Sequence, residues 1–434
     1  MRISLTLLLV LILGLLCLGC QYLPIPSQPP TEAPTQPPTE PPTEPSTEPP
    51  TEPVPTDPPA LETVELPTLY RPECQEYISL FRREDRTGWM CYIPKGDTME
   101  LLSWSNRVAQ VRYNGLTGYV AGQYIRPADD SFYDDCLELI SLRNDYSYTD
   151  MLRDLRILAD TYPESAQIRV MGYSEQGRIL PVLLLGDPQA KYQVLVQGSM
   201  HAREYFNTNL LMALSEYWLS RGMAGLEDVC FHIVPMVNPD GVVLCQSGVL
   251  TATQEPIYWE DHIRERTTLT GSLYVENWKA NALGIDLNRN FPAGWEAITG
   301  PITPSCERYK GTQPLDAKET RALADYTLAQ HWDVTLSYHS TGCVLYYEFG
   351  TNEANKLSKD LALAVSAVTG YTLEPSYTVE GGGYKDWALD ILGIPSLTIE
   401  TGCSYTPLAQ REVWSIFARN LEVFSTVAQW VKQR

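Results

Sequence analysis

Apolar and polar positions follow two rhythms along the chain from about residue 137 to the C-terminus. Apolar residues recur at helical spacing in four stretches, residues 148–162, 208–219, 317–330 and 412–431, which predicts amphipathic helices. Between such stretches lie short, strongly apolar runs that are typical of buried strands. Helices that alternate with buried strands predict an α/β domain, which we place at residues 137–434.

Residues 67–127 follow another pattern, in which short β-type runs alternate with turn signals. The runs include residues 77–80, 99–102 and 111–113, and the last of them ends in Asn114-Gly115, a strong hairpin signal. This part of the sequence therefore predicts a small all-β barrel that precedes the α/β domain.

The barrel segment resembles a known family. The stretches IPKG (93–96) and VRYNGLTGYV (111–120) are similar to the bacterial Src-homology-3 barrel. The resemblance implies a module that accompanies cell-wall enzymes and can bind wall peptides. That family usually has Trp where Val108 stands, so binding to the cell wall and a purely spacing or packing role both stay open.

The first twenty residues have the pattern of an export signal. Arg2 precedes an apolar run from Ile3 to Leu18, which is short for a membrane span. Gly19-Cys20 resembles the end of a bacterial lipoprotein signal, although that motif favours Leu where Cys17 stands. We therefore expect residues 1–20 to be a signal peptide. The protein is then either lipid-anchored through Cys20 to the outer face of the bacterial cytoplasmic membrane or simply secreted.

Residues 21–66 form a low-complexity linker. A period-four Thr-Glu-Pro repeat runs through residues 39–53, and 16 of the 33 prolines lie between residues 21 and 60. Pro fixes φ and the glutamates repel one another, so we expect an extended, disordered tether without a core. A lipid anchor would be the only contact with the membrane, and the tether would hold the domains away from its surface.

Charge and cysteine content exclude some classes of protein. The chain of 434 residues has a formal net charge of −21, which argues against a nucleic-acid partner because such proteins need a basic face. Cys17 and Cys20, in the apolar leader, are the only Cys-x-x-Cys pair among the ten cysteines, and the spacings of a zinc ribbon are absent. We expect most of the eight cysteines beyond the leader to be paired. Cys343 and Cys403 are one candidate pair, with two buried free thiols as the alternative.

Polar residues follow four of the predicted strands at their C-terminal ends. Residues 194–196 lead to His201 and Glu204, residues 334–338 lead to His339, and residues 396–399 lead to Glu400. A fourth strand, 233–237, leads to the sequence Asn-Pro-Asp-Gly. In open α/β sheets ligands bind at this edge, so we expect these side chains to converge.

The converging residue types indicate a zinc site. Two imidazoles and one carboxylate, from His201, His339 and Glu204, bind zinc and leave one coordination position open, as catalytic sites require. Glu400 is then available as a general base beside the metal. His201 and Glu204 alone would be a weak signal, because a Glu three residues after a His is frequent by chance.

The set of motifs resembles the zinc carboxypeptidase family. The segments GSMHARE (198–204), NPDG (238–241), WKANALGIDLNRNFPAGW (278–295), YHSTG (338–342) and TIETG (398–402) occur in that family's order. The resemblance implies a mixed, mostly parallel sheet flanked by helices, and one zinc ion per catalytic domain.

The resemblance also implies roles for individual residues. His201, Glu204 and His339 correspond to the zinc ligands, and Glu400 to the general base. The residues that correspond to substrate-binding or supporting positions are Arg203, Asn288 and Arg289, which line the cleft or hold a terminal carboxylate, and Asp286, which orients a ligand histidine.

Three further positions depart from the family pattern or align less directly. Lys279 stands where the family has an Arg that assists the oxyanion, so the charge is kept but the planar fork is lost. Tyr377 aligns near the family's mobile Tyr with an offset of one residue. Lys385 falls at the base of the leaving-group pocket, where it can bind a carboxylate or extend to water. We expect a strand here, with Asp386 on the opposite face.

Three functions compete. The segments WKAN, GIDLNRNFPAGW and GGGYKDW look most like the bacterial γ-D-glutamyl-diaminopimelate peptidases, which implies cleavage of peptidoglycan stem peptides. A general metallocarboxypeptidase that releases C-terminal, perhaps acidic, residues is the alternative. A non-catalytic cell-wall binding protein is the third reading, and the complete set of catalytic residue types argues against it.

Overall fold

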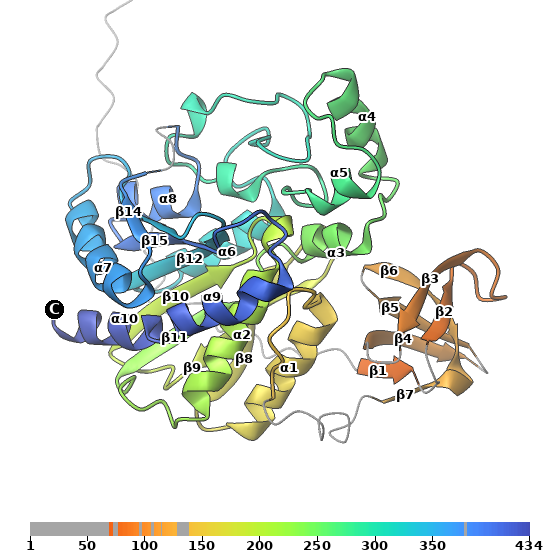
Figure 1. The fold of residues 1–434 in the computed structure, drawn as a ribbon, viewed down its shortest axis with the longest axis horizontal. Helices are drawn as coiled ribbons and strands as arrows, with labels where there is room; N and C mark the ends of the chain where they lie inside the picture. The colour runs from red at the N-terminus through yellow and green to blue at the C-terminus, as the bar shows by residue number, and fades with distance from the viewer. Residues whose placement is uncertain are drawn as a thin grey trace, which may run out of the picture. The chain divides into compact units, whose positions relative to one another are not determined.

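The computed structural model describes residues 69–72, 77–94, 98–105, 108–113, 115–127, 139–376 and 380–434 (Figure 1), without the side chains of residues 411 and 414. The predicted signal peptide (1–20), the predicted linker (21–66) and Tyr377 lie outside the described residues. The predictions made for them, and the predicted domain limits, therefore stay predictions.

The N-terminal part is a seven-stranded antiparallel sheet in the order β3-β2-β6-β5-β4-β1-β7. Its elements are β1 (Leu69–Pro72), β2 (Tyr77–Phe81), β3 (Trp89–Pro94), β4 (Met99–Ser105), β5 (Val108–Tyr113), β6 (Leu116–Ala121), the 3₁₀ turn η2 (Gly122–Tyr124) and β7 (Ile125–Pro127). The sheet is barrel-like but open, since no pairing of β3 with β7 is found among the described residues.

The alternation of buried and half-buried residues, together with a glycine at the hairpin turn, explains this small sheet. On β5, Ala109, Val111 and Tyr113 are buried and the residues between them are half-buried, as expected for a strand with one face on a core. β5 turns into β6 at the predicted hairpin, where Gly115 has φ +76°, a backbone angle that favours glycine. The β-type interpretation of this segment is therefore confirmed.

The C-terminal part is a mixed eight-stranded sheet in the order β14-β13-β15-β12-β10-β11-β9-β8. The strands are β8 (Ala166–Tyr173), β9 (Ile179–Leu185), β10 (Tyr192–Gly198), β11 (Val229–Val234), β12 (Val334–Ser340), β13 (Val344–Tyr346), β14 (Thr372–Glu374) and β15 (Ser396–Thr401). The central strands β11, β10, β12 and β15 are parallel to one another, which confirms the predicted mixed, mostly parallel sheet.

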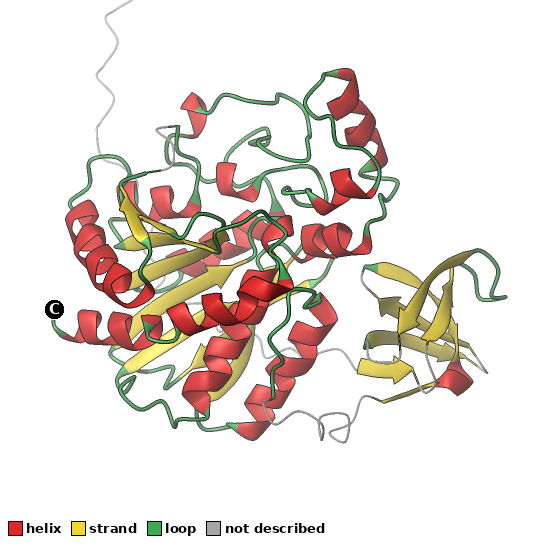
Figure 2. Ribbon diagram, viewed as in Figure 1, coloured by secondary structure: helices red, strands yellow, loops and turns green. Residues whose placement is uncertain are grey.

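Helices cover both faces of this sheet (Figure 2). The helices of this part of the chain are α1 (Tyr148–Thr161), α2 (Phe206–Leu219), α3 (Pro239–Ser247), α4 (Glu255–Ile263), α5 (Ser272–Glu276), α6 (Lys318–Leu328), α7 (Ala354–Thr369), α8 (Tyr384–Asp390), α9 (Val413–Asn420) and α10 (Val423–Lys432). Of these, α4 and α5 pack with α3 in a separate apolar cluster. The predicted helix over 412–431 is thus two helices. Leu421 lies between the two helices, and its backbone carbonyl accepts a hydrogen bond from the Trp218 indole N–H. Among the described residues, none of these helices combines the length and apolarity needed to span a bilayer.

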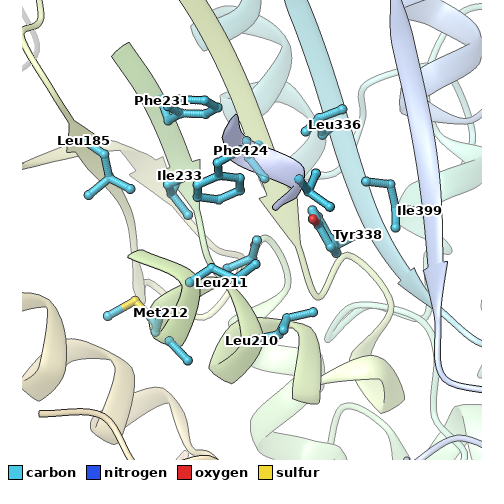
Figure 3. Close-up of a cluster of buried hydrophobic side chains, with 14 of the residues drawn as sticks. Leu185, Leu210, Leu211, Met212, Phe231, Ile233, Leu336, Tyr338, Ile399 and Phe424 are labelled. Carbon is cyan, nitrogen blue, oxygen red and sulfur yellow. The ribbon is translucent and has the colours of Figure 1, made fainter. Parts of the chain in front are cut away.

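Alternate residues along the central strands face opposite sides of the sheet and so belong to two separate cores. Leu336 and Tyr338 on β12 and Ile399 on β15 face the core formed with α2 and α10 (Figure 3), where Phe231 stacks on Phe424 with ring centroids 4.8 Å apart. Successive side chains on a strand point to opposite faces. His339 on β12 and Glu400 on β15 therefore project from the other face, where they are aligned in register.

One disulfide joins the ends of β12 and β15. Cys343 and Cys403 are bonded, with their Cα atoms 5.5 Å apart, so this predicted pair is confirmed. Among the described residues, Cys91, Cys230, Cys245 and Cys306 are free thiols. Since these are four of the eight cysteines beyond the leader, the prediction that most of the eight are paired is wrong. Two of these thiols are fully buried, which is usual for cysteine acting as a small apolar residue.

Candidate active site

The loop after β10 presents the first two predicted ligands. His201 precedes the 3₁₀ turn η4 (Ala202–Glu204), and Glu204 ends it. Asn238, from the Asn-Pro-Asp-Gly segment, fixes this loop because its side-chain amide donates to the carbonyls of Met200 and Ala280. The role of that segment is thus to join the His201 loop to the loop that carries Lys279.

Three side chains converge beneath the pocket. His201 Nδ1 lies 2.9 Å from Glu204 Oε1, His339 Nδ1 lies 2.9 Å from Glu204 Oε2, and the two Nδ1 atoms are 3.1 Å apart. All three residues are buried, and together they form a group whose ligand atoms are close enough to hold a metal ion. The structure thus brings together the three predicted ligands from two separate strand ends.

The electrostatics of this group suit a cation. Burial raises the pKa of Glu204, but the imidazoles of His201 and His339 outweigh burial and hold that pKa below its usual range. Ser340 also donates its backbone N–H to Glu204 Oε2 at 3.2 Å. The carboxylate is therefore ionised and presents both oxygens to the two histidines.

Asp286 lies behind His201, as predicted. Its Oδ1 is 3.2 Å from His201 Nε2, so the ring can donate Nε2–H to the carboxylate and keep Nδ1 free as a ligand atom. Burial raises the pKa of Asp286, but the facing His201 outweighs it and holds the pKa well below the usual range. Asp286 also accepts the backbone N–H of Asn288, which connects the metal group to the next part of the site.

Glu400 stands beside His339 across the β12–β15 pair. Burial, reinforced by Glu204, raises the pKa of its carboxyl to about 7, while His339 and Lys279 oppose the rise. A carboxylate with a pKa near neutral is matched to proton transfer at physiological pH. The position of Glu400 is therefore suitable for a general base.

A pocket of about 240 Å³ opens above the metal group. It is lined by the predicted site residues His201, Arg203, Glu204, Lys279, Asn288, Arg289, Lys385 and Glu400. It is also lined by Asp386, which was expected to face away from Lys385, and by residues that the sequence analysis did not single out: Ser340, Thr341, Tyr346, Ser376, Gly383, Thr398 and Thr406. Of these, Thr398 could have been found from sequence, because it precedes Glu400 by two positions on the same strand and so shares its face.

Asn288 and Arg289 come from the short turn η5 (Leu287–Arg289), which Asp286 caps. Asn288 Oδ1 accepts the backbone N–H of Tyr384, so this turn is hydrogen-bonded to the start of α8. Arg289 donates to the Asn288 carbonyl at 2.7 Å and lines the pocket. We call Asn288, Arg289, Gly383, Lys385 and Asp386 the α8 side of the pocket.

Arg203 and Lys279 line the pocket from other loops. Arg203 donates to the Asn277 carbonyl and lies 3.6 Å from the carboxylate of Glu307. Lys279 is held by its backbone N–H, which donates to the Cys306 carbonyl. Its charge lowers the pKa values of both Asp286 and Glu400. Both cations thus line the same pocket as the predicted metal ligands.

Lys385 lies in the pocket, but its surroundings differ from the prediction. Lys385 and Asp386 are on a helix rather than a strand, and adjacent residues on a helix are only about 100° apart around the axis. The Lys385 ammonium therefore reaches its neighbour, with Nζ 2.6 Å from Asp386 Oδ1 and 2.8 Å from the Glu348 carbonyl. The expectation that Asp386 points to the opposite face is wrong.

Glycines shape the approach to α8. Gly381 and Gly382 have φ +80° and +81°, and a Cβ on either residue would lie within 2.6 Å of other atoms. Both backbone groups of Gly382 are hydrogen-bonded to the loop after η5: its N–H donates to the Ala293 carbonyl, and its carbonyl accepts from the Phe291 N–H. The two halves of the α8 side are therefore held together by the backbone.

Comparisons with known proteins agree with this geometry. Gamma-D-glutamyl-L-diamino acid endopeptidase 1 of Lysinibacillus sphaericus is 31% identical over 302 residues, which is 66% of this chain and 73% of that protein. Carboxypeptidase B of Astacus astacus is 26% identical over 310 residues, 66% of this chain and 97% of the relative.

Solved structures show the same fold. Bovine thrombin-activatable fibrinolysis inhibitor, solved in complex with tick carboxypeptidase inhibitor, superimposes with a TM-score of 0.54 at 21% identity, covering 67% of this chain and 99% of that chain. The family model described as zinc carboxypeptidase matches residues 151–413. With the converged His201, Glu204 and His339 and the neighbouring Glu400, these matches show that the chain belongs to the zinc carboxypeptidase family.

Proposed function

We propose that this protein is an exported zinc peptidase that hydrolyses peptidoglycan stem peptides at the γ-D-glutamyl-diaminopimelate bond. The observation that carries the proposal is the pairing, in one pocket, of a metal-binding group and Glu400 with an α8 side that holds Arg289, Lys385 and Asp386. The charged groups on the α8 side of the pocket suit a leaving residue that itself has several charged groups. The relative from Lysinibacillus sphaericus, whose name describes cleavage before an L-diamino acid, supports the same substrate class.

The residues present fit a zinc ion. His201, Glu204 and His339 would hold it, because they supply two imidazoles and one carboxylate in a buried cluster. His339 Nδ1, which lies 2.9 Å from Glu204 Oε2 and 3.1 Å from His201 Nδ1, is the nitrogen placed to act as a ligand. His339 Nε2 is buried and has no hydrogen-bond partner among the described residues. When bound, zinc lowers the pKa of a water molecule towards about 7 and polarises the carbonyl under attack.

Glu400 would carry the proton in this reaction. Its carboxylate accepts a proton from the attacking water and then donates that proton to the departing amine. One group thus acts first as a general base and then as a general acid. The pKa of about 7, raised by burial, suits both steps because the group is poised between its two protonation states.

Cationic side chains would position the substrate. Arg289 presents a planar fork that matches a terminal carboxylate, with Asn288 beside it in η5. Lys279 lines the pocket near Glu400 and would stabilise the negative charge that develops on the carbonyl oxygen. Arg203, which is already anchored by Asn277, would border the same cleft. Tyr377 is proposed as a further substrate contact on the resemblance alone.

Export and tethering complete the proposal. The apolar leader and Gly19-Cys20 support a lipid anchor on the outer face of the cytoplasmic membrane, with secretion as the alternative. The linker would extend the enzyme toward the cell wall, and the barrel-like sheet would bind that wall or act as a spacer. Gel mobility after globomycin treatment or after Cys20→Ser would separate the anchored form from the secreted form.

A general metallocarboxypeptidase remains the second candidate. Relatives such as carboxypeptidase B of Astacus astacus, of which this chain covers 97%, support an enzyme that removes single C-terminal residues. In that case α-linked peptides would be cleaved and γ-D-glutamyl bonds would not.

The decisive experiment is mass spectrometry of purified muropeptides after incubation with the zinc-loaded enzyme. The proposed function predicts release of a fragment that begins with diaminopimelate and a product that ends in γ-D-glutamate. Glu400→Gln serves as the matched inactive control. Intact muropeptides, combined with turnover of benzoylglycyl peptides by the same preparation, would refute the wall-peptide assignment and favour the general carboxypeptidase.

A further inference from the structure

The α8 side of the pocket contains a buried ion pair. The side chains of Lys385 and Asp386 are only 7% and 9% exposed, yet both line the pocket. A buried ion pair is seldom an efficient source of stability, because removing two charges from water costs about as much as their attraction returns. A stabilising role is therefore a weak explanation for a pair placed on a pocket wall.

Both members of the pair keep unused hydrogen-bonding capacity. Lys385 has three N–H donors, and two of them reach Asp386 and the Glu348 carbonyl. Asp386 has about four acceptor sites, of which Lys385 and the Gly383 N–H take two. Among the described residues, one ammonium donor and two carboxylate acceptors are thus left for a molecule in the pocket.

The pair as a whole has no net charge, and this limits what it can bind well. A leaving side chain that ends in one carboxylate would be attracted by Lys385 and repelled by Asp386. A side chain that ends in one ammonium would be attracted by Asp386 and repelled by Lys385. A terminus that carries both an ammonium and a carboxylate can instead place each group against its opposite.

We propose that Lys385 and Asp386 form a clamp for a zwitterionic, amino-acid-like side-chain terminus on the leaving residue. This inference rests on the proposed function and deepens it, since diaminopimelate ends in one carbon that bears both an ammonium and a carboxylate. The clamp distinguishes such a residue from lysine, which has only the ammonium, and from a plain dicarboxylic residue.

The fold supports simultaneous binding of both ends of the leaving residue. Asn288 and Arg289, proposed to hold the main-chain carboxylate, are joined to the clamp by the bond from the Tyr384 N–H to Asn288 Oδ1. A Cβ on Gly383 would lie 3.0 Å from both Asn288 Oδ1 and Asp386 Oδ2, so the two sub-sites adjoin at that glycine. One leaving residue can therefore contact Arg289 with its main chain and the clamp with its side chain.

The first arm of the test compares leaving residues in the zinc-loaded enzyme. Peptides of L-Ala-γ-D-Glu linked to meso-diaminopimelate, its distal amide, L-lysine, L-2-aminopimelate or L-2-aminoheptanoate differ mainly at the side-chain terminus. We expect kcat/KM to be highest for diaminopimelate and lower by about tenfold to a hundredfold for each single-charge analogue, the loss typical of a charge-assisted contact. Equal rates across the series would overturn the clamp.

Variants make the test specific. Lys385→Met leaves Asp386 and should shift preference toward L-lysine, whereas Asp386→Asn leaves Lys385 and should shift it toward L-2-aminopimelate. The double variant should show little discrimination between the analogues. Lys359→Met, at an exposed position on α7, is the matched control. A uniform loss on all substrates, accompanied by a lower Tm, would show that the pair is structural and would refute the clamp.

The same leaving residues on a benzoylglycyl donor separate this inference from the proposed function. A zwitterion preference on benzoylglycyl substrates without cleavage of γ-D-glutamyl bonds would support the clamp and refute the wall-peptide function. Cleavage of γ-D-glutamyl bonds with no dependence on the side-chain terminus would refute the clamp alone.

Discussion

The metal group and the α8 side of the pocket are built differently. His339 and Glu400 lie on adjacent parallel strands in register, and His201 follows the next strand, β10, so the central sheet positions all three. Asn288, Arg289, Lys385 and Asp386 lie on a 3₁₀ turn and a short helix, which glycines with positive φ bring together. The predicted metal ligands and base thus depend on the sheet, while the groups predicted to bind substrate depend on loops.

This difference separates the predicted catalytic groups from the predicted substrate-binding groups. A fully buried parallel sheet tolerates little displacement, so groups at its strand ends keep their spacing when loops change. Loops with glycine turns can change their side chains without disturbing that spacing. Asp286 joins the two regions, because one of its oxygens contacts both His201 and the backbone of Asn288.

The largest effect should follow from removing a ligand from the sheet end. His339→Ala leaves His201 and Glu204 as the only predicted ligands, so we expect loss of bound metal and of all measurable turnover. Elemental analysis after desalting gives the metal content. His331→Ala removes an exposed histidine and should retain both properties. Full zinc occupancy in His339→Ala would mean that the metal binds elsewhere.

Removing the base without removing the metal should have the next largest effect. Glu400→Gln keeps the shape of the side chain but cannot accept the proton, so we expect kcat to fall about 10²–10⁴-fold with zinc still bound. Glu374→Gln, at an exposed position on β14, is the control. Turnover close to that of the parent enzyme would remove Glu400 from the mechanism.

Asp286→Asn tests the residue that contacts both the metal group and the α8 side of the pocket. The amide can still accept one hydrogen bond, but it no longer provides the charge that faces His201 Nε2. We expect zinc affinity to fall about 10–100-fold, as is usual for such supporting carboxylates. Competition with a chelator measures the affinity, and thermal unfolding checks the fold. Unchanged affinity together with an altered KM would assign Asp286 to the α8 side alone.

The smallest effect concerns the pH profile. Glu400 acts as a base when deprotonated, so kcat/KM should rise with pH through the pKa of Glu400, which is about 7 without a metal. A bound divalent cation lowers that midpoint further. Lys279 also lowers the pKa of Glu400, so Lys279→Met should move the acid limb upward while Lys359→Met should not. An unshifted limb would show that Lys279 does not act on Glu400.

The sequence by itself determined which residues meet at the predicted metal site. Each ligand or base follows an apolar strand, and parallel strands present their C-terminal ends at one edge, so His201, Glu204, His339 and Glu400 could be assigned together from pattern and resemblance. The pairing of Cys343 with Cys403 was predictable as a candidate for the same reason, since both follow strands that meet at that edge.

Only the tertiary structure decided the surroundings of these groups. The glycine turn before α8 places Lys385 and Asp386 on a helix, so they pair with each other, where a strand would have separated them. Cys230 and Cys245 are buried as free thiols, because pairing requires another cysteine close by in space, which spacing along the chain does not reveal. Local pattern fixes which face of a strand a residue occupies, but contacts between loops depend on how distant segments pack.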